Sequence, residues 1–333
     1  MFSRSATPPK TDYTACSGCS LCLLVCPVWR QTHDLRFTPH GRAKALQHGV
    51  PAVELAASIE SCTLCCACEP ACPENIDLVG MVLGLRRQLP PAASVPMQPR
   101  TTTPAADYTN HSVLLPDKGL RENTAACQRT ARLLGCTPAD DDGGDIALAL
   151  EAGVDIADTR RDAFLAPLRS ATGIIAADGL LARALRQWLP RMCIASTGAA
   201  LSARDELRRH LRADDLYVIE ARAFHTDHAR LLPHYDQLRR ETGCVMNLDL
   251  QRFAIPATAR GLRHRLGLDA PDDSEPVRWI LHGRKIRRIV TESVEDAAAF
   301  ESACDLPVTL LVRIADLADD MNMQTPIRST PLP

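Results

Sequence analysis

Aromatic residues make up only 4% of the 333 residues, so stacking on single-stranded nucleic acid is not expected. The chain has 38 Lys and Arg against 40 Asp and Glu, a net charge of -2, which excludes strong attraction of the whole chain to nucleic acid or an anionic membrane. No run of about 18 apolar residues occurs, so no transmembrane helix is expected, and the polar N-terminus lacks the apolar core of a signal peptide. These absences favour a cytoplasmic protein that contacts the inner face of a membrane only through a partner.

Cysteine, in contrast, is abundant. Nine of the 14 cysteines lie between Cys16 and Cys72. In a cytoplasmic chain such a density is more typical of metal binding than of disulfides.

The nine cysteines form two similar runs. The first is Cys16-Ser-Gly-Cys19-Ser-Leu-Cys22-Leu-Leu-Val-Cys26-Pro27, and the second is Cys62-Thr-Leu-Cys65-Cys66-Ala-Cys68-Glu-Pro-Ala-Cys72-Pro73. Both fit C-x2-C-x2-C-x3-C-P, in which three cysteines bind one [4Fe–4S] cluster and the fourth binds the other cluster. The runs therefore predict two [4Fe–4S] clusters, one held by Cys16, Cys19, Cys22 and Cys72, and one held by Cys62, Cys65, Cys68 and Cys26.

Zinc and disulfides are the alternative interpretations of the two runs. Structural zinc sites usually consist of paired C-x2-C halves and not of four-cysteine runs that end in proline. Cys66 is surplus to both ligand sets, and we expect it to be a bystander. With a cysteine on every iron, such clusters relay single electrons and leave no open position for a substrate.

A long, helix-prone insert from Val28 to Glu60 separates the two runs. Together with the segment Thr38-Pro39-His40-Gly41-Arg42, the runs resemble the helical two-cluster domains of heterodisulfide reductase C subunits, glycolate oxidase iron–sulfur subunits and anaerobic glycerol-3-phosphate dehydrogenase C subunits. The resemblance covers about residues 12 to 88.

The rest of the chain reads as an α/β region behind a linker. Residues 90–111 are rich in proline and predict a linker, and residues 321–333 predict a loose tail. Between them, short apolar segments precede helix-prone ones, a pattern that favours parallel strands. The expected pairs are Val113–Leu115 with Asn123–Leu134, Thr172–Ala176 with Leu180–Leu189, Leu216–Glu220 with Leu231–Glu241, and Arg288–Thr291 with Glu295–Cys304.

The predicted fold class is thus α+β: a helical two-cluster ferredoxin-like domain over residues 1–89, then an α/β domain of two similar halves over residues 112–320. In the resembling families the second domain carries cysteine-rich CCG motifs in each half. This chain has Asp117-Lys118-Gly119, Asp140 to Asp145 and Ala177-Asp178-Gly179-Leu180 at the corresponding places in the first half, and Ala223 to His228 in the second. The resemblance therefore implies a degenerate CCG domain without its metal ligands.

Several further residues carry weaker hypotheses. The basic segment Arg284 to Arg288 is more typical of a solvated face than of a docking patch. His225, His228 and His234 could bind a metal or a quinone edge, although histidines more often have structural roles. The cysteines outside the two runs favour buried apolar thiols over a third cluster; they are Cys127, Cys136, Cys193, Cys244 and Cys304.

The predicted function is electron transfer by an iron–sulfur subunit of a multi-subunit oxidoreductase, with a flavoprotein or dehydrogenase subunit as the expected partner. Two alternatives remain open from the sequence. The chain could be an oxidoreductase that acts on its own substrate at a C-terminal site, or a scaffold whose clusters are structural.

Overall fold

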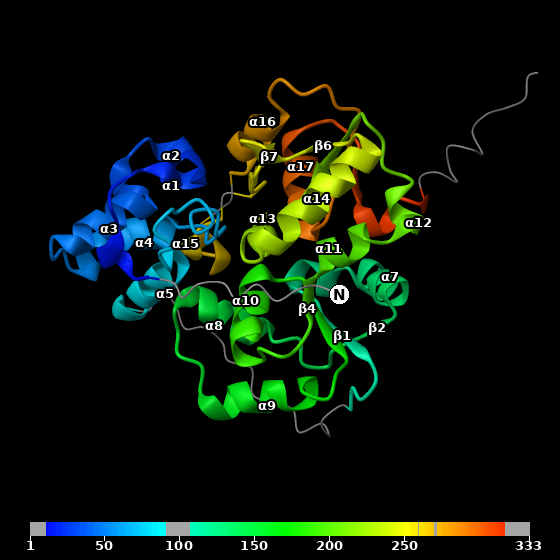
Figure 1. Cartoon of the computed structure of the whole chain (residues 1–333), viewed down its shortest axis with the longest axis horizontal. Coiled ribbons are helices and arrows are strands. Elements are labelled where there is room, and N and C mark those ends of the chain that lie inside the picture. Colours follow the sequence, from blue (N-terminus) through cyan, green and yellow to red (C-terminus); the bar gives the residue numbers. More distant parts are fainter. Residues whose placement is uncertain (1–10, 91–106, 259, 270–271, 317–333) are drawn as a thin grey trace, which may run out of the picture.

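The computed structural model of the chain describes residues 11–90, 107–258, 260–269 and 272–316. Its first part is a helical lobe, coloured blue to cyan in Figure 1, which lies beside the two α/β halves. None of the described helices is long and apolar enough to cross a membrane. The elements of the helical lobe are η1 (Tyr13–Ala15), α1 (Leu21–Leu24), α2 (Pro27–Thr32), η2 (Leu35–Phe37), α3 (Pro39–Gln47), η3 (Ala52–Leu55), α4 (Ala56–Ser61) and α5 (Leu78–Gln88).

Helix starts in this lobe follow from local sequence. Proline occupies the first position of α2 and α3, where the absent N–H costs no hydrogen bond. Thr38 caps α3 by accepting a hydrogen bond from the amide of Gly41, and Asp77 caps α5 by accepting one from the amide of Gly80. Each cysteine run is thus followed by a well-defined helix start, α2 directly after Cys26 and α5 shortly after Cys72, and Cys22 itself lies on the short helix α1.

The first α/β half contains a four-stranded parallel sheet in the order β2-β1-β3-β4. Its strands are short and largely buried, as expected of parallel strands covered by helices on both faces. The elements are β1 (Ser112–Leu115), α6 (Lys118–Glu122), α7 (Thr124–Leu134), β2 (Cys136–Pro138), α8 (Gly144–Ala152), α9 (Asp158–Leu168), β3 (Gly173–Ala176), α10 (Gly179–Trp188), β4 (Ile194–Ser196), α11 (Thr197–Ser202) and α12 (Asp205–Arg208).

The second half repeats this topology. Its parallel sheet has the order β10-β9-β5-β6, so the second strand of each half lies on one side of the first strand and the third lies on the other. A small antiparallel pair, β7 with β8, is added to this half. The elements are β5 (Asp215–Val218), α13 (Ala221–His225), α14 (His228–Thr242), β6 (Val245–Met246), β7 (Leu248–Asp249), β8 (Phe253–Ala254), α15 (Leu262–Arg265), α16 (Ser274–Leu281), β9 (Arg288–Thr291), α17 (Val294–Ala303), β10 (Val308–Leu310) and η4 (Leu311–Arg313).

The halves and the helical lobe share apolar cores. One buried cluster joins Leu114 of the first sheet to Tyr217 and Val290 of the second sheet. In the cluster that forms the core of the helical lobe, Leu180 of α10 packs with Ile59 and Val82. The first helix turn after β3 is therefore part of the interface with the helical lobe.

The fold agrees with the predicted mixture of helices and parallel strands, and the four expected strand–helix pairs are confirmed as β1 with α7, β3 with α10, β5 with α14 and β9 with α17. Tyr108, at the end of the predicted linker, is buried in the core of the first half, and its hydroxyl accepts a hydrogen bond from the amide of Asp140. Most of the predicted linker and all of the predicted tail lie outside the described residues.

We predict that Gly179→Ala destabilises the protein by about 1–3 kcal/mol, the usual cost of overpacking. A Cβ at Gly179 would lie 2.4 Å from the amide nitrogen of Ala223, because the starts of α10 and α13 meet there backbone to backbone. Gly84 of α5 is the matched control, since nothing lies within 4 Å of a Cβ added there. Gly84→Ala should stabilise the helix by about 1 kcal/mol. Denaturant unfolding of both variants checks this pair, and equal effects would contradict the close contact.

Candidate iron–sulfur site

The structure brings four cysteines of the two runs together around a first small cavity. Cys16, Cys19 and Cys22 reach it from the first run and Cys72 from the second. The first run can curl around the cavity because Gly18 has a φ of +86°, in the left-handed region that favours glycine. This is the group that the crossed pattern assigns to one cluster.

Helix α3 braces the first cysteine loop from the side. The ammonium group of Lys44 donates a hydrogen bond of 2.8 Å to the carbonyl oxygen of Cys16, and the side-chain amide of Gln47 donates one of 3.1 Å to the same oxygen. The loop position is therefore set by side chains of the insert as well as by its own backbone.

The segment Thr38-Pro39-His40-Gly41-Arg42 has a clear structural role. No side chain fits at Gly41, because a Cβ would lie 1.9 Å from the carbonyl oxygen of Leu35. Arg42 is buried, and its guanidinium donates to the carbonyl and hydroxyl oxygens of Ser58. The segment thus ties the start of α3 to α4, which leads directly into the second cysteine run.

A second cavity is lined by the other four cysteines of the crossed pattern. These are Cys26, Cys62, Cys65 and Cys68, and the surplus Cys66 also borders it. The thiol of Cys66 is buried and donates a hydrogen bond of 3.1 Å to the carbonyl oxygen of Leu64. The walls are otherwise mostly apolar, with Val79 and Val82 of α5 among them.

The pKa values of the thiols reflect the same division into two groups of cysteines, one around each cavity. Burial raises the pKa of Cys22 to about 11, and Cys16, Cys72 and Cys19 raise it further. Burial likewise raises the pKa of Cys65 to about 12, with Cys26 and Cys62 as the charged neighbours that add to the shift. Thiols in such surroundings stay protonated unless a cation compensates the thiolate, which is what iron ligation supplies.

The donor sets fit iron–sulfur clusters better than zinc. A zinc ion needs its thiolates at about 2.3 Å from one centre. Among the described residues, no group of three or more His, Cys, Asp or Glu side chains is arranged to hold one metal ion. In a [4Fe–4S] cluster each cysteine binds a different iron, so the thiols lie farther apart around a larger body.

The α/β halves reach the second cysteine loop through a buried arginine. Arg222, at the start of α13, has a side chain that is only 6% exposed; it pairs with Glu151 of α8 at 3.1 Å and donates to the carbonyl oxygen of Thr63. Burial alone would raise the pKa of Glu151, but Arg222 and Arg265 outweigh it and lower that pKa to about 2. The isolated Arg222 carried no sequence signal, and sequence analysis did not find it.

Further polar contacts reinforce this interface. Arg86 of α5 donates to the carbonyl oxygens of Glu151 and Cys62, and Arg183 of α10 pairs with Glu69 at 2.9 Å. Buried arginines held by several acceptors resist displacement. The second cysteine loop is therefore clamped between α5 and the helices of both halves.

Only one of the three histidines singled out in the sequence approaches the cysteine loops. The Nδ1 of the buried His225 lies 2.7 Å from the carbonyl oxygen of Cys65, and its Nε2 accepts from the amide of Ala254. Burial lowers the pKa of His225 to about 3, so the ring is neutral. His228 stacks on Phe253 and His234 bonds to Ser202, so the three histidines do not form a common metal site.

The cysteines outside the two runs and the basic segment Arg284 to Arg288 do not form functional sites in the described residues. Cys127 and Cys244 lie in the core shared by the halves, and the partly buried Cys136 and Cys304 pack against the cores. The expectation of a buried thiol is wrong for Cys193, which is exposed. Within the basic segment, Arg288 pairs with Asp215 inside the second half. Neither feature forms a separate site among the described residues.

Comparison with known proteins agrees with this geometry. Residues 12–76 match the family model of the 4Fe-4S dicluster domain. The chain is an iron–sulfur protein. No curated protein and no solved structure gives a significant match to the chain. The matched stretch contains both cavities' cysteines and supports iron–sulfur electron transfer.

We predict that Cys19→Ser and Cys65→Ser each impair one cluster, lowering the iron content from about eight to about four per chain. Cys66→Ser should leave iron content and spectrum unchanged, because the crossed sets are complete without Cys66. Iron analysis and visible absorption of anaerobically purified protein check this series. Loss of iron in the Cys66 variant alone would contradict the ligand assignment.

We also predict that Arg222→Met destabilises the protein by about 3 kcal/mol, because the buried Glu151 loses one of its two arginine partners, Arg222 and Arg265. Arg287→Met is the matched control. Arg287 is 83% exposed and lies 3.7 Å from Asp214, so its loss should cost at most about 1 kcal/mol. Denaturant unfolding of the two variants measures the difference; similar losses would show that Arg222 does not hold the interface.

Proposed function

We propose that this protein is an iron–sulfur electron-transfer subunit of a multi-subunit oxidoreductase, with one [4Fe–4S] cluster at each of the two cysteine cavities. Bound there, the clusters would take up and release single electrons. The observation that carries the proposal is the pairing of two four-cysteine cavities in one small lobe, with Cys26 and Cys72 each contributed by the run that surrounds the other cavity.

The two cavities differ in their contact with solvent. This difference indicates which of them an external electron-transfer partner can approach. Cys19 of the first cavity is exposed. The loop around the second cavity is covered by the α/β halves through Arg222 and His225. We infer that an external partner exchanges electrons at the first cavity.

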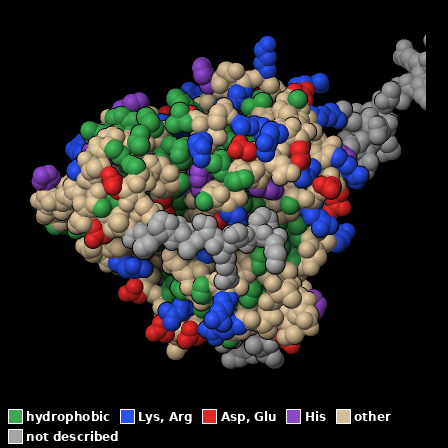
Figure 2. Space-filling view, in the orientation of Figure 1, with side chains coloured by type: hydrophobic (Ala, Val, Ile, Leu, Met, Phe, Trp, Pro, Cys, Tyr) green, Lys and Arg blue, Asp and Glu red, His purple; other side chains and the backbone are tan. Residues whose placement is uncertain are grey.

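The surface beside the first cavity has the character of a protein contact. On α1, Leu21 and Leu24 are 44% and 55% exposed, and Figure 2 shows hydrophobic side chains gathered over α1 and α2. Exposed apolar patches of this kind mark interaction sites. A flavoprotein or dehydrogenase subunit is the partner that the proposal requires.

The resemblance to heterodisulfide reductase C, glycolate oxidase and glycerol-3-phosphate dehydrogenase subunits supports this assignment at a finer level. In this proposal the α/β halves are a degenerate relative of the CCG domain, since Asp140 and Asp178 lie in the segments that correspond to cysteine motifs. The competing scaffold function predicts clusters that do not change oxidation state at accessible potentials, which a redox titration distinguishes.

Anaerobic affinity purification from the native host, with mass spectrometry of co-eluting proteins, tests the subunit function. We expect a flavoprotein or dehydrogenase in stoichiometric amount, and at least a several-fold lower recovery with Leu24→Glu, since a buried carboxylate opposes the contact. Leu268→Glu, at another exposed leucine, is the control and should leave recovery unchanged. A chain that elutes alone with both clusters would contradict the proposal.

A further inference from the structure

A cavity of about 810 Å³ lies between the two α/β halves, well within the size of small-molecule sites. Its lining includes the residues two positions after the first and third strands of each half, and it extends to Asp296 in the first turn of α17. These residues are Asp117 after β1, Asp178 after β3, Glu220 after β5 and Ser293 after β9. In each sheet these two strands are the neighbours at which the strand order reverses. Ligands of open parallel sheets bind at such points, outside the carboxyl ends of the strands, and here two of them face one cavity.

The cavity is unsuited to an anion. Helix starts that could bind a phosphate are already filled by the chain's own carboxylates: Asp117 accepts from the amide of Leu120, Asp178 from that of Leu181, and Glu220 from that of Ala223. Ten carboxyl side chains line the cavity against six from lysine and arginine. Carboxyl groups therefore outnumber lysine and arginine side chains in the lining.

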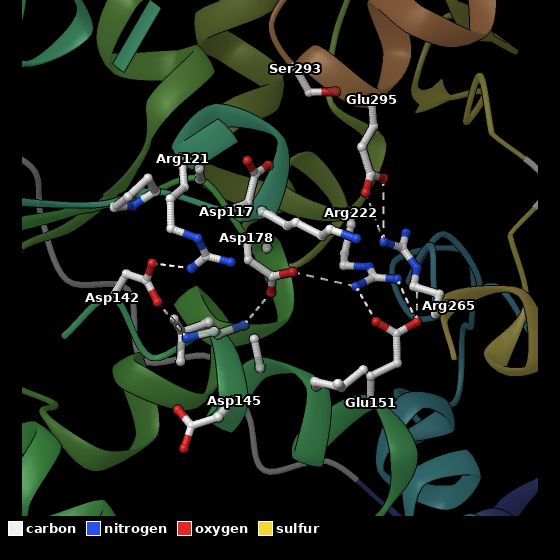
Figure 3. A pocket seen from close by; sticks show the side chains of 18 of the residues that line it. Asp117, Arg121, Asp142, Asp145, Glu151, Asp178, Arg222, Arg265, Ser293 and Glu295 are labelled. Atoms are coloured by element: carbon white, nitrogen blue, oxygen red, sulfur yellow. Dashed lines mark hydrogen bonds and ion pairs between the residues drawn. The ribbon is translucent and has the colours of Figure 1, made fainter. Parts of the chain in front are cut away.

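Three carboxyl groups near the strand ends form no ion pair with a described residue. Figure 3 shows Glu151, Asp178 and Glu295 joined to arginines by dashed lines, whereas Asp117 has no such line to the arginines drawn. Glu220 and Asp296 likewise form no ion pair with a described residue. Burial raises the pKa of Asp117 to about 6 and that of Glu220 to about 7, because the charges of Arg265 near Asp117 and of Arg222 near Glu220 are too weakly coupled to offset it.

Asp296 is the most enclosed of these three acids. It is 7% exposed, and its neighbours include Glu220, Glu292 and Glu295, while the Ser293 hydroxyl is its hydrogen-bond partner. Burial, followed by the charge of Glu220, raises its pKa well above the usual range. A buried carboxyl among other carboxyls is unfavourable for folding, and such groups are typical of binding sites.

The arrangement of the lining carboxyls also favours an organic cation over a metal ion as the ligand. No three carboxyl, thiol or imidazole groups of the described residues are arranged to hold one metal ion, and Asp117, Glu220 and Asp296 are among those residues. Carboxyls spread around a larger space can instead accept hydrogen bonds from an ammonium or guanidinium group. We propose that this cavity binds a small organic cation, a molecule with a protonated amine or guanidine, whose charge lies against Asp117, Glu220 and Asp296.

Binding to the anaerobically purified, cluster-loaded full chain tests the proposal. The probes are putrescine and agmatine, with the neutral 1,4-butanediol and the anionic succinate as controls of similar length. We expect heat on titration and a rise in Tm of about 2–4 °C or more with at least one cationic probe. Neither control should bind. Absence of binding by both amines, or stronger binding by succinate, would overturn the proposal.

A variant of Asp296 locates the binding and separates it from a folding defect. Asp296→Asn should weaken binding of the amine by about tenfold or more, while Tm of the ligand-free chain stays equal or rises because like-charge repulsion is relieved. Glu301, exposed on the same helix α17, provides the control variant Glu301→Gln, which should change neither quantity. Unchanged amine binding in Asp296→Asn would place the cation elsewhere. None of these measurements depends on the proposed electron transfer.

Discussion

The buried contact of Arg222 with Glu151 and with the carbonyl oxygen of Thr63 is the interaction on which the arrangement of the parts depends. Glu151 belongs to the first half, Arg222 to the second, and Thr63 to the second cysteine loop, so one guanidinium joins all three. Charges this deeply buried are tolerated only when paired. Any relative movement of the lobe and the halves would break this pairing, which makes their mutual position a property of the fold and not of a flexible hinge.

Sequence predicted the local features well and the long-range ones poorly. The cysteine ligands could be proposed because their spacing is a property of one loop, and strands such as β5 and β9 could be found because buried parallel strands are short apolar runs. The edge strands β2 and β6 are only three and two residues long and gave no usable pattern. Arg222 could not be recognised, because an arginine looks the same in sequence whether it faces solvent or a cysteine loop.

The cavity between the halves is a second long-range feature that could not be predicted from the sequence. Asp117, Asp140 and Asp178 attracted notice in sequence only as departures from cysteine motifs, yet all three line one cavity. What places them together is the repeated strand order, which aims the carboxyl ends of both sheets at a common space. The position of this cavity therefore follows from the topology of the two sheets. The residue types that line the cavity decide which ligands it can bind.

The distance along the chain between the clamped partners has a consequence for biogenesis. Thr63 and Cys65 receive their partners from residues 159 and 160 positions later. Domains fold as they emerge, N-terminal first, so the cysteine loops leave the ribosome well before Arg222 and His225 exist to cover them. Until then the second cysteine loop lacks the cover that Arg222 and His225 provide. The contacts that cover the second cysteine loop thus form late in synthesis, after both cysteine runs have emerged.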